Sequence, residues 1–267
     1  MPRAIWSGAV SFGLVNVPVK LVGAVQPKDV RFHQLEASTG ARVKQRRVSS
    51  KTGEEVPYEE IVKGFEISPD TYVTVTPEEL EALDPKVTRA IDIEDFVDLD
   101  QIDPLYYERP YYLVPDKGGT KAYALLVEAM KESQKVGIAR LVLRTKQYLA
   151  AIRPLGDALV LETLLYADEV TLPDELEGLP HDVDISDREL KIARQLIESL
   201  STDFEPERYH DDYREKVLEL IEQKAEGRQV VTQPAAEEPT KVLDLMAALE
   251  ASLAEAKEAK GKKSQTA

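Results

Sequence analysis

The chain has 267 residues, of which 43% are hydrophobic and 31% are charged, so it can bury a sizeable core and is not disordered throughout. It contains no cysteine, which excludes disulfides, thiolate metal sites and a cysteine nucleophile. The formal net charge of -15, taken as a sum, argues against nucleic acid, because lysine and arginine must neutralise phosphates.

The N-terminal part of the chain is predicted to be mainly β-structure. Residues 3–25 mix apolar and small side chains without helical spacing, which predicts two short strands joined by a turn near Val15–Val17. Residues 30–35 and 42–48 have the pattern of a two-stranded ribbon on either side of a turn-rich EASTGA. Ser49–Gly53 predicts a second turn.

A strand and a short helix are expected next. Tyr72–Thr76 alternates as a strand does, and a helix is predicted over residues 77–83. Thr76 as N-cap and Glu79 three residues later form the pattern of a capping box. Residues 91–102 place apolar side chains among acids, which predicts an edge strand followed by a turn.

The pattern then indicates a closed β-structure. Residues 110–114 predict a tyrosine-rich strand, and Thr120 is expected to cap a helix. Three strands are predicted between Gly137 and Ala167, with a turn at Pro154–Asp157. The short spacings favour antiparallel pairing, and we expect a mixed α+β chain with an antiparallel β-barrel core.

From Ser186 onward the pattern is helical. A capping box at Ser186–Glu189 begins a helix over 187–200, and a second helix is predicted from about Asp211 to Glu226. We expect a last amphipathic helix over 240–259 and a short basic tail. Four parts are predicted. They are a barrel core at 1–185 with a ribbon inserted at about 28–70, a pair of helices at 186–226, a linker at 227–239, and a C-terminal helix with tail at 240–267.

Basic residues are segregated along the chain. Three stretches contain no aspartate or glutamate, namely residues 1–28, 37–53 and 133–156. On extended strands, side chains two apart share a face, so rows of cations could follow DNA phosphates. By charge alone, two solvated sheet faces are an equally good interpretation. The candidate DNA-binding residues are Lys20, Arg31, Arg42, Lys44, Arg46, Arg47, Lys51, Arg140, Arg144 and Lys146.

Aromatic residues indicate the mode of binding. Tyr148 is the only aromatic residue in the two longer internal stretches, 37–53 and 133–156. A platform for single strands needs aromatic side chains on which bases stack. We therefore expect contacts with the backbone of double-stranded DNA, which carry no sequence information.

Several separated segments resemble the bacterial Ku family. They are RAIWSGAVSFGLVNVPVKL at 3–21, RFHQL at 31–35, GEEVPYEEIVKGFE at 53–66 and DFEPERYHDDYREKVLELIEQK at 203–224. The resemblance implies a homodimer whose barrels carry ribbons that arch into a ring around linear DNA. It also implies a non-enzymatic role in non-homologous end joining and recruitment of a multifunctional ATP-dependent DNA ligase. The basic residues 42–51 fall where the family's bridge lies.

The chain departs from the family pattern in two places. Many members carry a Cys-x-x-Cys pair in the bridge, where this chain has Ser49 and Thr52, so no metal or redox role is expected there. The histidines are scattered, and no cofactor is expected. Some members carry a long lysine-rich tail, whereas the tail is short here, which argues against strong DNA binding by the tail.

Two predicted helices have an apolar face whose packing partner is not evident from the sequence. The stripe on 187–200 fits either the core or an interlock between two chains. A helix beyond a flexible linker has little to pack on, so the stripe on 240–259 is expected to enter a partner's groove. Docking on the barrel is the alternative. The stripe assigned to the ligase consists of Val242, Leu245, Met246, Leu249 and Leu253.

The leading hypothesis is a repair protein that binds DNA ends, located in the cytoplasm and associated with the nucleoid. No signal peptide and no apolar run of about 18 residues is present, so no membrane partner is expected. The alternative is an acidic interaction scaffold whose basic strands contact acidic proteins. A hydrolase that uses carboxylates of residues 92–103 is a third hypothesis, although a solvated face explains those acids more simply.

Overall fold

The computed structural model describes residues 3–83, 89–143, 146–180, 183–227 and 245–264. Its strands are β1 (Ala4–Phe12), β2 (Val15–Gly23), β3 (Lys63–Ser68), β4 (Thr71–Val75), β5 (Ala90–Asp98), β6 (Tyr107–Pro115), β7 (Lys135–Leu143), β8 (Lys146–Leu155) and β9 (Ala158–Leu164). Its α-helices are α1 (Pro77–Leu83), α2 (Thr120–Ser133), α3 (Asp187–Leu200), α4 (Asp212–Ala225) and α5 (Leu245–Ser264). The chain divides into two units, residues 1–28 with 33–175 and residues 29–32 with 176–267.

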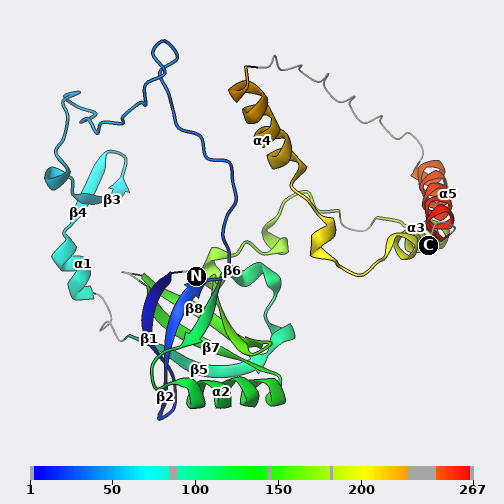
Figure 1. Ribbon diagram of the computed structural model, residues 1–267, viewed down its shortest axis with the longest axis horizontal. Coiled ribbons are helices and arrows are strands. Elements are labelled where there is room, and N and C mark those ends of the chain that lie inside the picture. The colour runs from blue at the N-terminus through cyan, green and yellow to red at the C-terminus, as the bar shows by residue number, and fades with distance from the viewer. Residues whose placement is uncertain (1–2, 84–88, 144–145, 181–182, 228–244, 265–267) are drawn as a thin grey trace. The chain divides into compact units, whose positions relative to one another are not determined.

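Seven strands of the first unit close into a barrel, in the order β1-β2-β6-β9-β8-β7-β5 (Figure 1). The predicted α+β class and barrel are confirmed, with two corrections. The barrel is not wholly antiparallel, because β1 and β5 run parallel, with Val10 opposite Ile91. β5 is not an edge strand, because it also pairs with β7, and a closed barrel leaves no edge.

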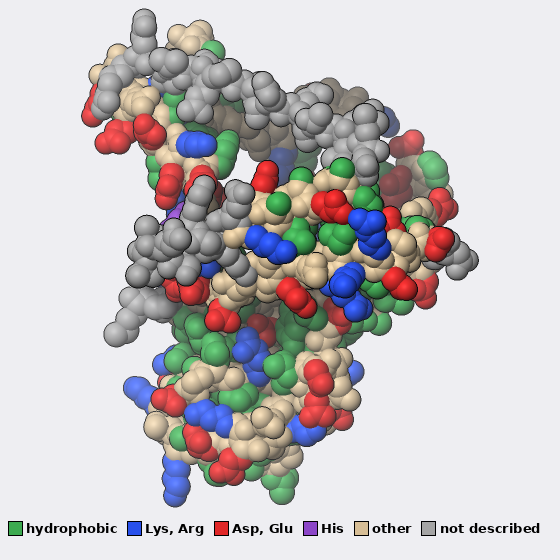
Figure 2. All heavy atoms as spheres, turned by 90° about the vertical axis from the view of Figure 1, so that its right-hand side faces the viewer, with side chains coloured by type: hydrophobic (Ala, Val, Ile, Leu, Met, Phe, Trp, Pro, Cys, Tyr) green, Lys and Arg blue, Asp and Glu red, His purple; other side chains and the backbone are tan. Residues whose placement is uncertain are grey.

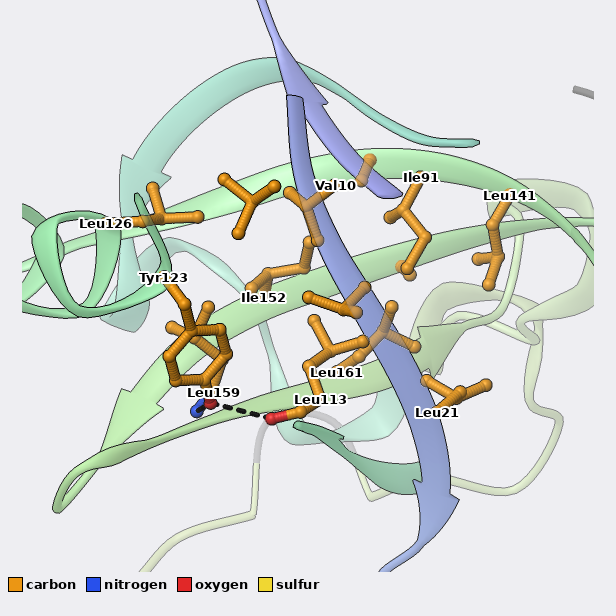
Figure 3. Close-up of a cluster of buried hydrophobic side chains, with 14 of the residues drawn as sticks. Val10, Leu21, Ile91, Leu113, Tyr123, Leu126, Leu141, Ile152, Leu159 and Leu161 are labelled. Carbon is orange, nitrogen blue, oxygen red and sulfur yellow. Dashed lines mark hydrogen bonds between the residues drawn. The ribbon is translucent and has the colours of Figure 1, made fainter. Parts of the chain in front are cut away.

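The core lies inside the barrel and follows from the alternation of its strands. Val17, Val19 and Leu21 of β2 are fully buried, because every second side chain of a strand points to the same face. Figure 3 shows part of the core, in which Leu21 of β2 is labelled together with buried side chains of the other strands and of α2. The largest buried side chains from the other strands are Val10, Ile91, Leu113, Leu141, Ile152, Leu159 and Leu161.

Helix α2 covers the barrel with one apolar face (Figure 1). The predicted face is confirmed, since Tyr123, Leu126, Val127 and Met130 are all buried. The predicted cap is wrong: Gly119 is the N-cap, and no side chain caps this helix. A Cβ at Gly119 would lie 2.6 Å from the Pro18 carbonyl oxygen, so a capping side chain has no room there.

The Tyr123 hydroxyl joins the helix to two strands. It donates a hydrogen bond to the Leu113 carbonyl of β6, at 2.6 Å, and accepts one from the Leu159 N–H of β9, at 2.7 Å (Figure 3). Burial raises the pKa of Tyr123, so the hydroxyl keeps its proton and its ability to donate. The Leu113 carbonyl and the Leu159 N–H lie where the pairing of β6 with β9 ends, and the Tyr123 hydroxyl gives both a hydrogen-bond partner inside the core.

Residues 24–76, which we call the arm, differ from the predicted ribbon. No regular strand forms at 30–35 or 42–48, where Leu35 and Arg42 make only an isolated bridge. The regular ribbon is β3 with β4, of which only the second strand was predicted. An isolated two-stranded ribbon is marginally stable in water, so pairing in the arm is short and local.

Local signals elsewhere are confirmed or shifted slightly. The capping boxes at Thr76–Glu79 and Ser186–Glu189 both form. The first hairpin turns at residues 13 and 14, just before the predicted Val15–Val17. The start of the predicted last helix, residues 240–244, lies outside the described residues. No helix among the described residues is long and apolar enough to cross a membrane.

Replacing Tyr123 with phenylalanine should lower the free energy of unfolding by about 1–3 kcal/mol, because two buried backbone groups lose their partner. Urea unfolding measures the change. Tyr213→Phe is the matched control, because Tyr213 is 79% exposed and its hydroxyl can bond to water. Equal stability of the two variants would show that the Tyr123 hydrogen bonds do not stabilise the barrel.

Candidate nucleic-acid interface

Six of the predicted DNA-binding residues lie in the arm, namely Arg31 and the five residues of its basic segment. Arg42, Lys44, Arg46, Arg47 and Lys51 are all exposed. Their common face, inferred from a strand at 42–46, stays a prediction, because the segment forms no regular strand. The structure provides a set of solvent-exposed cations, four between two tight turns and Lys51 on the second turn.

Two tight turns hold this basic segment. The Glu36 N–H donates to the Ala41 carbonyl at 2.8 Å, which closes the first turn just before Arg42. The Ser49 N–H donates to the Glu54 carbonyl, also at 2.8 Å, which closes the second. Both turns were predicted from their residue types. They fix the backbone on each side of residues 42–48.

The Ser49 hydroxyl organises the second turn from within. It accepts hydrogen bonds from the N–H groups of Lys51 and Thr52, at 3.3 and 3.4 Å. Gly53 completes the turn in the left-handed region, with φ of 74°, where glycine carries no steric penalty. Ser49 therefore closes the turn by hydrogen bonds and places Lys51 at its tip.

Arg46 and Arg47 are held differently from their neighbours. Arg46 pairs with Glu55, with 2.9 Å between Nη1 and Oε2, so its charge is partly compensated. Arg47 stacks over the ring of Tyr58 at 5.3 Å from the centroid, and such a contact orients a guanidinium while leaving its N–H donors available. An open groove of about 720 Å³ lies between these side chains.

The barrel cations, in contrast, face carboxylates. Lys20 lies 2.7 Å from Asp116, and the hydrogen bond from Lys20 contributes most to holding the pKa of the Asp116 carboxyl below its usual range. On the face in Figure 2, acidic and basic side chains are interspersed and form no single basic patch. The other pairs are Lys135 with Asp98, Arg140 with Glu94, Lys146 with Glu169 and Arg153 with Glu162.

The two predicted basic regions are therefore not equivalent. Arg42, Lys44 and Lys51 make no ion pair within the described part of the chain, whereas Lys20, Arg140 and Lys146 each make one. A phosphate that approaches the barrel cations must compete with a carboxylate already in place. Arg31 is exposed, and Arg144 lies outside the described residues.

The acids of 92–103 were noticed in the sequence, but their pairing with the barrel cations was missed, because it depends on the register of two strands. In the register of β5 with β7, Asp92 lies opposite Arg140 and Asp98 opposite Lys135. Opposite charges on neighbouring strands attract at such spacing. The acidic run at 92–103 is thus a structural complement of the third basic stretch. No group of three or more metal-ligating side chains occurs among the residues that the structure describes.

Known proteins match nearly the whole chain. Residues 11–192 match a family model described as the Ku70/Ku80 beta-barrel domain. A non-homologous end joining protein Ku of Anaeromyxobacter sp. (strain K) is 57% identical over 96% of this chain and 87% of its own length. Non-homologous end joining protein Ku 1 of Saccharopolyspora erythraea is 44% identical over 98% of this chain and 81% of its own length. The protein of that name in Archaeoglobus fulgidus is 42% identical, over 93% and 99%.

The difference between free and paired cations predicts how DNA binding depends on salt. The triple change Arg42→Ala, Lys44→Ala and Lys51→Ala should weaken binding to a random-sequence duplex. It should also reduce the slope of log K against log salt by about 2 to 3, at about 0.9 for each lost phosphate contact. Fluorescence anisotropy at several salt concentrations gives the slope.

The matched control is Lys20→Ala, Arg140→Ala and Lys146→Ala, which removes the same charge from the barrel. Its slope should change by less than about 1, because these cations already hold carboxylates. A larger effect of the barrel variant than of the arm variant would place the contact surface on the barrel.

Proposed function

The chain belongs to the Ku family of non-homologous end joining proteins, and we propose that it binds the ends of double-stranded DNA without sequence preference. The Ku family is a family of non-catalytic DNA end-binding proteins, so the prediction that the chain is not an enzyme is confirmed. In the proposed mode, two copies form a ring through which a linear duplex threads. The observation that supports this proposal most directly is that Arg42, Lys44 and Lys51 are exposed and make no ion pair with any residue that the structure describes.

Charge distribution supports this mode. Residues 28–53 contain seven lysines and arginines against two acids, in a chain with a net charge of -15. DNA is therefore attracted to one segment and repelled by most of the remaining surface, which orients the approach. Contacts from Arg42, Lys44 and Lys51 to phosphates carry no base information, which fits a protein that must accept any broken end.

Exposed apolar side chains of the arm support the second copy. Both strands of the β3–β4 ribbon are almost wholly exposed, including Phe65 at 70% and Ile67 at 61%. A ribbon of this kind is marginal alone, and contiguous exposed apolar side chains mark protein interfaces. We propose that the arms of two chains meet through this ribbon, and that the helical part at 186–226 adds to the dimer contact.

The remaining parts complete the proposal. Residues 1–185 form the core with its bridge, and the helices of 186–226 contribute to the dimer. Residues 227–239 are the linker, and residues 240–267 carry the helix that binds the partner. The C-terminal helix recruits a multifunctional ATP-dependent DNA ligase, and the complex works on nucleoid DNA in the cytoplasm. The scaffold alternative has no comparable support, because the chain already neutralises its own barrel cations.

Threading predicts that an accessible DNA end is required. A linear duplex should bind much more tightly than the same DNA closed into a covalent circle, because a preformed ring can load only at an end. Competition binding with labelled linear DNA and both forms as competitors gives the ratio. Linear DNA whose ends are blocked by a bulky protein is the control, and it should behave like the circle. Equal binding to all three forms would rule out threading.

A further inference from the structure

Helix α5 packs against α3 of the same chain. Leu253 is 9% exposed, and it is the only apolar side chain classed as buried among the described residues from 176 onward. Arg188 at the start of α3 donates a hydrogen bond from Nη2 to Glu250 Oε1 of α5, at 3.1 Å. The expectation that this helix has little of its own to pack on is therefore wrong, because α3 of the same chain covers part of its apolar face.

The contact joins two apolar stripes. On α5, Met246, Leu249 and Ala256 are half-buried around Leu253, at the spacing of one helical face. On α3, Ile192, Ala193, Leu196 and Ser199 are half-buried at the same spacing. In the described part of the chain, α5 is the element that packs most extensively on α3. The half-buried face of α3 is therefore the face that α5 covers.

The stripe covered by α3 is largely the one assigned to the ligase. Met246, Leu249 and Leu253 belong to both, whereas Leu245 is 62% exposed and Val242 lies outside the described residues. A helix cannot place the same side chains in two grooves at once. Binding of an outside partner through these residues requires α5 to leave α3.

We propose that α3 is an internal receptor for α5, and that the ligase competes with α3 for the apolar stripe of α5. This rests on the proposed recruitment of a ligase by the C-terminal helix. While α5 is docked, the apparent affinity for the partner falls by the fraction of chains in which α5 is free. A partner that binds only the free helix shifts the population toward release.

The contact is suited to reversible exchange. Leu253 is the one side chain of its apolar part that is almost fully buried in the described residues. Its ion pair is largely exposed, since 76% of the Arg188 side chain and 54% of the Glu250 side chain are accessible. Exposed ion pairs are screened by salt and contribute little. Within α3, Leu190, Ile197 and Leu200 stay exposed, so α5 covers only one face of its receptor.

Thiol labelling tests the docking directly, because the chain has no cysteine of its own. In the full-length chain, Leu253→Cys should react with a maleimide at least about tenfold more slowly than Leu245→Cys, because a covered thiol reacts only when the helix opens locally. The two positions lie on the same helix and replace the same residue type. Equal labelling rates would overturn the docking.

A charge reversal tests whether α3 is the receptor. Arg188→Glu in the Leu253→Cys chain should accelerate labelling by about two- to fivefold, the range set by one exposed ion pair. Glutamate is favourable in the first turn of a helix, so α3 itself is not disturbed. Adding Glu250→Arg restores the opposite charges and should return the slower rate. No acceleration, or no rescue, would show that another surface covers Leu253.

Ligase binding separates this inference from the function on which it rests. A purified multifunctional ATP-dependent DNA ligase should bind the Arg188→Glu chain more tightly than the wild type, by the same factor as the labelling. Equal affinity would overturn the competition. If the ligase binds neither chain, the recruitment proposal fails and the ligase is overturned as the competitor, while the labelling experiments still decide the docking.

Discussion

Closure of the barrel through β1 is the constraint on which the rest of the structure depends. β1 pairs with β2 on one side and with β5 on the other, so the last strand before the arm and the strand at which the chain re-enters the barrel both flank β1. The approach is close at Gly8, where a Cβ would lie 2.2 Å from the Arg89 carbonyl oxygen. The arm therefore begins after one neighbour of β1 and the chain re-enters the barrel at the other, and none of the arm's residues belongs to the buried core.

Ion pairs between neighbouring strands neutralise the cations of the barrel, so the barrel and the basic segment of the arm differ in their exposed charge. The pairing of β5 with β7 sets Asp98 opposite Lys135 and brings Glu94 beside Arg140, so these barrel cations already have carboxylate partners. In the basic segment of the arm, turns closed by backbone and serine hydroxyl groups replace strand pairing, and carboxylates are scarce. In this acidic chain the positive charge is therefore concentrated where few carboxylates cancel it, which is the charge distribution that the proposed binding of a polyanion requires.

The sequence predicted what depends on near neighbours in the chain. The capping boxes at Thr76 and Ser186, the buried face of α2 and the three strands after Gly137 were all anticipated, because their signals lie within a few residues. It could not predict what depends on distant register. The parallel pairing of β5, the neutralised barrel cations and the docking of α5 on α3 all join segments that no periodicity connects. The candidate residues were named from the sequence, but only the structure shows that Lys20, Arg46, Arg140 and Lys146 already make ion pairs.

The most direct test of the account is topological. The protein would be loaded on a linear duplex, the DNA would be closed into a circle by an added ligase, and the complex would be challenged with high salt and competitor DNA. A closed ring around the duplex predicts that the protein stays on the circle and leaves after the circle is cut by a restriction enzyme. Release from the intact circle at the rate seen for linear DNA would contradict the account.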